Sequence, residues 1–235
     1  NIISIDINKK NNIAPLKILS FDIECIGSNG FPQATNINDQ VIQISNVCYT
    51  EGNDATSLEL SNHDNYNYKC VFTLNTCSPI TGCQIKSYES EIELLREWAN
   101  FIRKLDPDIL TGYNIINFDL PYLLDRARFM NVHSFPYLGR IKSIRSMIKN
   151  RSHRTSIHIP GRVQMDLLPI IRENHKLRSY SLNSVSYHFL KLQKDDVHHS
   201  IIGDLHNGTD DTRRRLAMYC LCLLYTSDAA DDVLC

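Results

Sequence analysis

The sequence predicts an α/β domain with a mixed central sheet flanked by helices. Strand-like segments come first along the chain, an amphipathic helical segment follows them, and strands and helices then alternate. The chain has 235 residues, of which 43% are hydrophobic and 22% charged, which is enough for one sizeable globular domain.

Four segments in the first part of the chain are predicted to be strands. The first is an apolar run, the second alternates apolar and polar residues, and the last two are shorter and flank a turn-like CSPITG stretch. Their ranges are 16–24, 41–49, 68–74 and 83–88.

The first helix is predicted over residues 90–105. Ser90 and Glu93 have the spacing of a capping box, and Pro107 stops the helix. Apolar residues recur at helical spacing on one face, namely Leu95, Trp98, Ile102 and Leu105, and the first three are expected in the core.

The second half alternates strands and helices. Residues 108–114 read as a buried strand, and 118–130 as a helix with Pro121 in its first turn. The basic segment 140–162 is predicted to be a loop or hairpin. A strand running into a helix, a short helix and the start of another helix follow at 162–171, 181–190 and 210–224.

Composition excludes several classes of protein. The formal net charge of -1 does not indicate a nucleic-acid partner. The sequence has no run of 18 apolar residues, so a membrane span is not expected. No signal peptide is visible, and the eight cysteines, without C-x-x-C spacing, fit reduced thiols in the cytosol or nucleus. No G-x-G-x-x-G follows the first strand, which disfavours a nicotinamide-binding domain. A first residue of Asn1 rather than Met indicates an internal piece of a longer protein.

Two acids on the first predicted strand require an explanation. Asp22 and Glu24 are two apart, so their side chains point the same way. Their like charges repel unless a cation lies between them, and Mg²⁺ bound through oxygen is the usual partner. Asp119 follows the end of a buried strand and could join such a cluster. It could also cap the next helix, and the two roles do not exclude each other.

The motifs around these acids resemble a known family. FDIE (21–24) and YNIINFD (113–119) are similar to the D-x-E and N-x-x-x-F-D motifs of the proofreading exonuclease domain of family B DNA polymerases. Further blocks resemble the catalytic subunits of eukaryotic replicative polymerases in the same order, among them FPYLGR, GRVQMDLL, KLRSYSLNSVSYHFL and RRRLAMYCL. The resemblance covers residues 16–221.

The resemblance implies a ribonuclease-H-like fold and 3′-to-5′ removal of mispaired nucleotides from a primer end. It implies two Mg²⁺ ions, or Mn²⁺, about 3.5–4 Å apart. Asp22 would bridge both ions, Glu24 would serve the nucleophile side, and Asp119 would serve the leaving-group side.

The same motifs imply residues that contact DNA. Phe31 matches a position whose ring stacks on the terminal base, although a hydrophobic plug under a loop is the alternative. Asn114 and Phe118 would contact or frame the strand end, and Tyr219 would position the attacking water.

The chain departs from the family pattern near its end. The third motif, Y-x-x-x-D, supplies a last metal-binding Asp, but Leu223 stands four residues after Tyr219. Residues 222–235 resemble the translation of a sequencing adapter and are interpreted as a non-native tail, with a natural divergent end as the alternative. We expect impaired exonuclease activity from the chain as written. A catalytically decayed DNA-binding module and a stand-alone nuclease of the same fold are the competing functions.

Other residues have less specific readings. Asp166 is read as a helix cap, and His198 and His199 as surface residues. Two basic groups could lie near DNA or be solvated: Lys142, Arg145, Lys149, Arg151 and Arg154 in one, and Lys176 and Arg178 with Tyr180 in the other.

The resemblance also implies the setting of the parent protein. Residues 1–15 are a tail or an entry from a preceding domain, and 16–221 form the exonuclease domain. The expected partners are the single-stranded 3′ end of primer DNA, polymerase accessory subunits and a sliding clamp, in the nucleus and without a membrane. The polymerase site, and any iron–sulfur or zinc module, would lie outside this chain.

Overall fold

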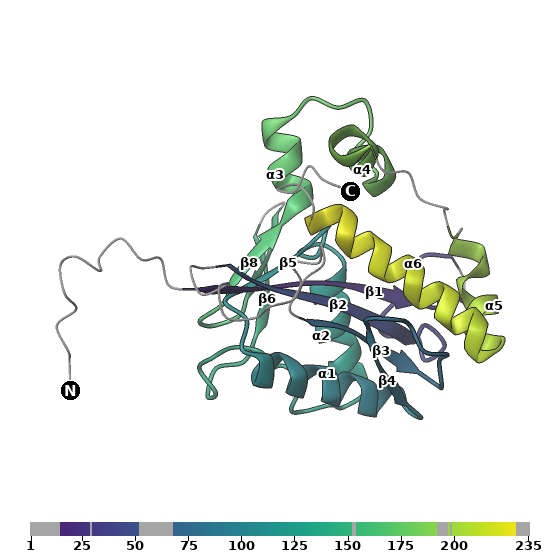
Figure 1. Cartoon of the computed structure of the whole chain (residues 1–235). Helices are drawn as coiled ribbons and strands as arrows, with labels where there is room; N and C mark the ends of the chain where they lie inside the picture. The colour runs from purple at the N-terminus through teal and green to yellow at the C-terminus, as the bar shows by residue number, and fades with distance from the viewer. Residues whose placement is uncertain are drawn as a thin grey trace.

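A six-stranded mixed sheet forms the centre of the computed structural model, which describes residues 15–28, 30–51, 68–151, 154–191, 197 and 199–228. The strand order is β4-β3-β2-β1-β5-β8 (Figure 1). The strands are β1 Leu16–Cys25, β2 Val41–Glu51, β3 Tyr68–Leu74, β4 Gln84–Tyr88, β5 Ile109–Gly112 and β8 Val163–Asp166. β1, β2 and β3 pair antiparallel, whereas β3–β4, β1–β5 and β5–β8 pair parallel, so the predicted mixed sheet is confirmed.

Helices cover both faces of this sheet. α6 lies across β1 and β2 on one face, whereas α1 packs on β3 and β4 from the other, next to α2 (Figure 1). The helices are α1 Glu91–Leu105, α2 Asp119–Phe129, α3 Leu167–Asn174, α4 Leu182–Leu190, η3 His199–Ile201, α5 Ile202–Asn207 and α6 Asp210–Asp228. η3 and α5 were not predicted, because they are too short to show a helical period.

The segment read as a loop or hairpin is a hairpin, formed by β6 (Met147–Arg151) and β7 (Arg154–His158). Three members of the basic group in segment 140–162 have described side chains. These residues, Lys142, Arg145 and Lys149, are all exposed. No helix within the described ranges combines the length and apolar character needed to cross a membrane.

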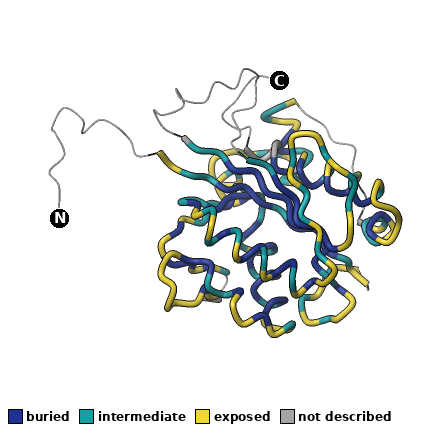
Figure 2. Tube along the Cα trace, turned by 60° about the horizontal axis from the view of Figure 1, so that its bottom comes forward, coloured by how far each residue is buried: buried dark blue, intermediate teal, exposed yellow. Residues whose placement is uncertain are grey.

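The main core lies between the sheet and α1 and α2. Trp98 is fully buried, its ring centroid lies 5.3 Å from that of Phe21, and its Nε1–H donates to Asn46 Oδ1 at 2.9 Å. Ser90 caps α1 by accepting from the Glu93 N–H, as predicted. Figure 2 shows the buried strands running through the middle of the molecule, with exposed residues in the loops around them.

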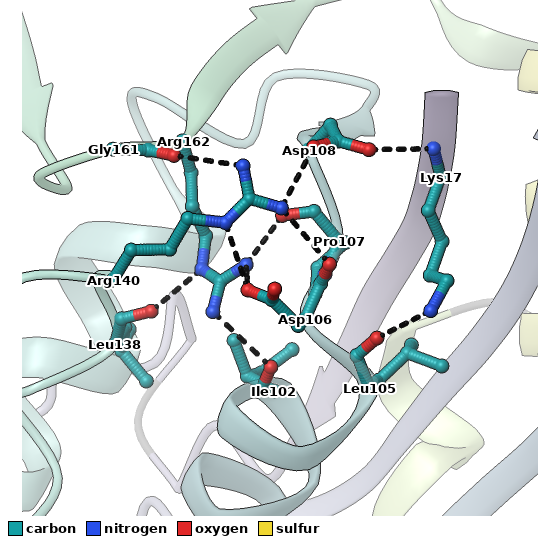
Figure 3. Close-up of polar contacts among 10 residues, drawn as sticks. All are labelled: Lys17, Ile102, Leu105, Asp106, Pro107, Asp108, Leu138, Arg140, Gly161 and Arg162. Carbon is teal, nitrogen blue, oxygen red and sulfur yellow. Dashed lines mark hydrogen bonds and ion pairs between the residues drawn. The ribbon is translucent and has the colours of Figure 1, made fainter. Parts of the chain in front are cut away.

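A polar network fixes the end of α1 to the start of β1 (Figure 3). Arg140 and Arg162 both donate to Asp106 Oδ1 at 2.8 Å, and Arg140 also donates to Asp108 at 2.7 Å. Asp108 in turn accepts from the backbone N–H of Lys17 at 2.8 Å. The network therefore sets the register in which β1 and β5 run side by side.

Candidate active site

β1 divides its side chains between the two faces of the sheet. Phe21 and Ile23 join the core beneath α1 and α2, so Asp22 and Glu24 point to the opposite face, under α6. Asp22 is half-buried and Glu24 is buried. The predicted pairing of the two carboxylates on one face is therefore present.

α6 brings a thiol to these carboxylates. Cys220 Sγ lies 3.3 Å from Asp22 Oδ2, and ligand atoms of Asp22, Glu24 and Cys220 all lie within 4.8 Å of one another. Burial raises the pKa of the Cys220 thiol well above its ordinary value, and the charges of Asp22 and Glu24 raise it further. In this arrangement the protonated thiol donates to the Asp22 carboxylate.

Asp119 approaches the same strand from its open edge. β5 pairs with β1 only as far as Ser20, so the N–H of Ile23 lies beyond the ladder and donates instead to Asp119 Oδ1 at 3.2 Å. Burial raises the pKa of the Asp119 carboxyl well above its usual range, and the neighbouring charge of Asp22 adds to the shift. The structure thus brings Asp22, Glu24 and Asp119 together at one end of β1.

The alternative reading of Asp119 as a helix N-cap is wrong. The N-cap of α2 is Phe118, and Asp119 is the first helical residue. Its carboxylate accepts a hydrogen bond from the β1 backbone, at the N–H of Ile23. The sequence position before a helix suggested a cap, but the missing β5 partner of Ile23 determines where the side chain goes.

The last residue of β5, Gly112, approaches β1 very closely just before the loop that leads to α2. A Cβ at Gly112 would lie 2.7 Å from the carbonyl oxygen of Phe21, so only glycine allows this approach. Asn114 follows with a left-handed φ of 66°, and its side-chain oxygen accepts from Asn117 Nδ2 at 3.1 Å.

Asp166 holds this loop in place. It is the N-cap of α3, where Oδ1 accepts from the Leu168 N–H at 3.0 Å. It also accepts from the N–H groups of Asn114 at 2.8 Å and Ile116 at 3.0 Å. The predicted cap is confirmed, and its bonds to the loop make Asp166 a positioning residue for the segment that carries Asn114, Phe118 and Asp119.

An aromatic pair lies beside the carboxylates. Phe31 is 75% exposed, and its ring centroid lies 5.2 Å from that of Phe118 in an edge-on arrangement. The hydrophobic-plug reading of Phe31 is therefore wrong. A cleft of about 700 Å³ runs from this pair to Glu24 and to the α5 region around Gly203.

Hydrogen bonds to Asp39 hold the loop that carries Phe31. Asp39 accepts from the Ser28 N–H at 2.9 Å and from the Gln33 N–H at 2.8 Å. Burial alone would raise the pKa of Asp39, but these hydrogen bonds lower it below its ordinary value. Arg126, paired with Glu91 at 2.7 Å inside the core, donates to the carbonyls of Ala34, Asn36 and Ile37.

The residues at this face fit a divalent cation. Ser20, Gln43 and Ser45 line up with Asp22 and Glu24 on β1 and β2 and are buried. Within the described residues, the two hydroxyls and the Gln43 side-chain oxygen have no hydrogen-bond partner. Two carboxylates with buried, unsatisfied oxygens around them match the oxygen ligands that Mg²⁺ prefers.

The third predicted motif lies on α6. Tyr219 is half-buried there and precedes Cys220, which reaches Asp22. Position 223 lies one helical turn beyond Tyr219, within the bounds of α6. A residue at this position therefore lies on the helix that covers the carboxylates.

Several predicted residues remain away from these contacts. Lys176 and Arg178 are exposed, and Tyr180 is held by its own loop through a bond to the His175 carbonyl at 2.7 Å. His198 and the side chain of His199 lie outside the described residues. A role near DNA stays a prediction for Lys176, Arg178 and Tyr180, and a surface position stays a prediction for the two histidines.

Sequence reasoning missed Cys220, Ser45 and the α5 side of the cleft. Cys220 stands directly after Tyr219 in a matched block, which was the available signal. Its contact with Asp22 depends on how α6 crosses β1, which no local pattern encodes.

Comparisons with known proteins agree with this geometry. A family model described as "DNA polymerase family B, exonuclease domain" matches residues 2–185. The DNA polymerase delta catalytic subunit of Drosophila melanogaster is 51% identical over 221 residues, covering 90% of the chain and 19% of that protein. The subunit of Mesocricetus auratus is 49% identical over 219 residues, covering 89% and 19%, and that of Dictyostelium discoideum is 48% identical over 227 residues, covering 92% and 20%. The chain thus spans about a fifth of the length of these relatives.

Proposed function

The chain belongs to the family B DNA polymerase exonuclease domain family, and from this premise we propose that it hydrolyses DNA from the 3′ terminus with the help of divalent cations. The family resemblance read from the motifs, and its extension to the delta catalytic subunit, are confirmed. The observation that carries the proposal is the pair of carboxylates Asp22 and Glu24 on one face of β1, with Asp119 bonded to the backbone N–H of Ile23 between them.

We infer that these three carboxylates would hold two Mg²⁺ ions, with Mn²⁺ as a substitute. The bound cations would supply a hydroxide from water and stabilise the departing 3′ oxygen. The chain's own residues would exclude bulk water beneath α6. Bound cations would favour the ionised form of Asp119, because burial and the charge of Asp22 raise the pKa of its carboxyl. Tyr219, on α6, would orient the attacking water.

The cleft supports binding of a single-stranded 3′ end. Phe31 would stack on the terminal base through its exposed face while Phe118 supports its edge. Stacking tolerates any base, which suits an enzyme that must remove all four. Asn114, held by its backbone bond to Asp166, would frame the strand end.

The chain as written lacks the last acid of the third motif, because Leu223 occupies its place. We infer that its hydrolytic activity is weak for that reason and that residues 222–235 are not native to the parent. A DNA-binding module with a decayed centre is the second candidate, and Leu223 is the observation that favours it.

The activity of the parent is also a proposal. The name of the relatives supports a DNA-directed DNA polymerase. We infer that the parent acts in the nucleus with accessory subunits and a sliding clamp. Its polymerase site and any iron–sulfur or zinc module would lie in the four-fifths of the relatives that this chain does not span.

The test is digestion of a 5′-labelled single-stranded oligonucleotide in Mg²⁺ by the chain carrying Leu223→Asp. We expect a ladder of products shortened from the 3′ end, abolished by EDTA and by Asp119→Asn. An intact oligonucleotide with a folded, metal-loaded variant would favour the decayed module.

A further inference from the structure

The contact between Cys220 and the carboxylates has a different chemistry from that of the proposed magnesium site. Cys220 is fully buried and Glu24 is 7% exposed. One ligand atom from each of Asp22, Glu24 and Cys220 lies within 4.8 Å of the other two. The donor set is two carboxylate oxygens and one sulfur. Magnesium accepts oxygen and rejects sulfur, whereas zinc-like cations accept both.

A second observation at the same place points to a ligand. Ser45 faces Asp22 across the β1–β2 ladder and therefore shares its face of the sheet. Its side chain is fully buried, and its hydroxyl has no hydrogen-bond partner of ordinary geometry in the part of the chain that the structure describes. The hydroxyl nevertheless lies beside the Cys220 thiol, and this side-chain contact offsets part of the rise that burial causes in the pKa of the thiol. A buried hydroxyl beside three ligand atoms is a ready partner for a cation-bound water.

We propose that Asp22, Glu24 and Cys220 form a binding site for a thiophilic divalent cation of the Zn²⁺ or Cd²⁺ class. One metal–sulfur bond forms, and the thiol proton leaves to solvent. Three protein ligands leave a fourth tetrahedral position open, as in zinc sites that keep a water. Zn²⁺ would thereby compete with Mg²⁺ for the same carboxylates and inhibit hydrolysis. This consequence rests on the proposed function, whereas the binding itself does not.

The experiment is a Cd²⁺ titration of the full chain under reducing conditions, followed by the ultraviolet charge-transfer absorption of a cadmium–thiolate bond. Cys220→Ser should weaken the binding that produces this band at least tenfold. The matched control is Cys222→Ser, two residues further along the same helix and exposed, which should leave the band unchanged. Equal affinity of Cys220→Ser and the parent chain, or loss of the band in Cys222→Ser, would overturn the proposal.

A second variant separates the loss of a metal ligand from the loss of the fold. Asp22→Asn removes a ligand from a half-buried position while keeping the side-chain volume, and it should also weaken Cd²⁺ binding at least tenfold. Circular dichroism checks that each variant is folded. If Asp22→Asn binds Cd²⁺ as the parent does, the thiol binds elsewhere and the site is wrong.

Failure of this inference and of the proposed function are distinguishable. Digestion of DNA by the Leu223→Asp chain in Mg²⁺ without a Cys220-dependent band would refute the thiophilic site alone. A Cys220-dependent band with no digestion would refute the nuclease alone. When both hold, micromolar Zn²⁺ should inhibit the digestion, and a chelator selective for zinc over magnesium should reverse the inhibition.

Discussion

At the scale of single residues, the account depends on where a few buried polar groups point. Asp22 and Glu24 could be placed on one face from a two-residue spacing alone, because strand alternation leaves no other arrangement. The position of Asp119 just past a buried strand suggested that it could join them, and the family motif implied its role. The bond that directs it, from the Ile23 N–H, exists because β5 ends its pairing early, which no local sequence pattern encodes.

Leu223 is the residue whose replacement should change the chain most. Leu223→Asp should raise the rate of Mg²⁺-dependent digestion by at least about 100-fold, because a missing metal ligand costs several kcal/mol of transition-state stabilisation. The rate on 5′-labelled single-stranded DNA checks this, with Leu223→Asn as the uncharged control. Full activity of the chain with Leu223 in place would contradict the assignment of the third motif.

Phe31 should contribute to substrate binding rather than to folding. Its ring is 75% exposed, so Phe31→Ala should leave the melting temperature unchanged while weakening single-stranded DNA binding about 5- to 150-fold, the equivalent of about 1–3 kcal/mol of stacking. Tyr187→Ala, another exposed aromatic residue at 55% exposure, is the control. Equal loss of DNA affinity in both variants would show that Phe31 does not stack on the terminal base.

At the scale of elements, most strands and helices could be predicted, whereas the two shortest helices could not. β1 and α1 were predicted within a residue of their observed bounds, because their patterns run over many residues and α1 has a capping serine and a following proline. η3 and α5 were missed, although α5 borders the cleft. Helices this short are stabilised by packing rather than by their own sequence.

Asp166 connects two elements, and its substitution should affect both. Asp166→Ala removes the α3 cap and the acceptors for Asn114 and Ile116, so the free energy of unfolding should fall by about 2–4 kcal/mol. Asp166→Asn keeps the Oδ1 acceptor and loses the bond from Ile116, so its loss should be smaller. Urea denaturation gives the ranking. An Asn variant as unstable as the Ala variant would mean that the loop bonds are unimportant.

His206 on α5 should make stability depend on pH. Burial lowers the pKa of His206 to about 4, and the positive charge of Arg213 adds to the shift. A lowered folded-state pKa means that the fold keeps the neutral ring, so its contribution is fully present above about pH 6.5 and is lost as the pH falls toward 4.

The free energy of unfolding should therefore fall by about 2–3 kcal/mol across this window through His206 alone. His206→Gln should flatten that part of the profile, measured by denaturation at several pH values in EDTA. His133→Gln, at an exposed site, is the control and should leave the slope unchanged. A profile equally steep in His206→Gln would place the acid sensitivity elsewhere.

At the scale of the whole molecule, two differently composed faces of one sheet separate stability from chemistry. The face beneath α1 and α2 is an apolar core with Trp98 at its centre. The face beneath α6 has polar groups at the end of β1 and a small apolar cluster farther along the helix. The fold class followed from the order of elements in the sequence, but this division required the register of β1 against β2 and the position of α6.

The most direct test of the central claim is the number of Mn²⁺ ions bound by the Leu223→Asp chain, measured by titration calorimetry with free Mn²⁺ followed by electron paramagnetic resonance. The account predicts two ions, with binding lost or reduced to one in Asp22→Asn and in Asp119→Asn. Binding that both substitutions leave unchanged, or no binding by the folded chain, would contradict it.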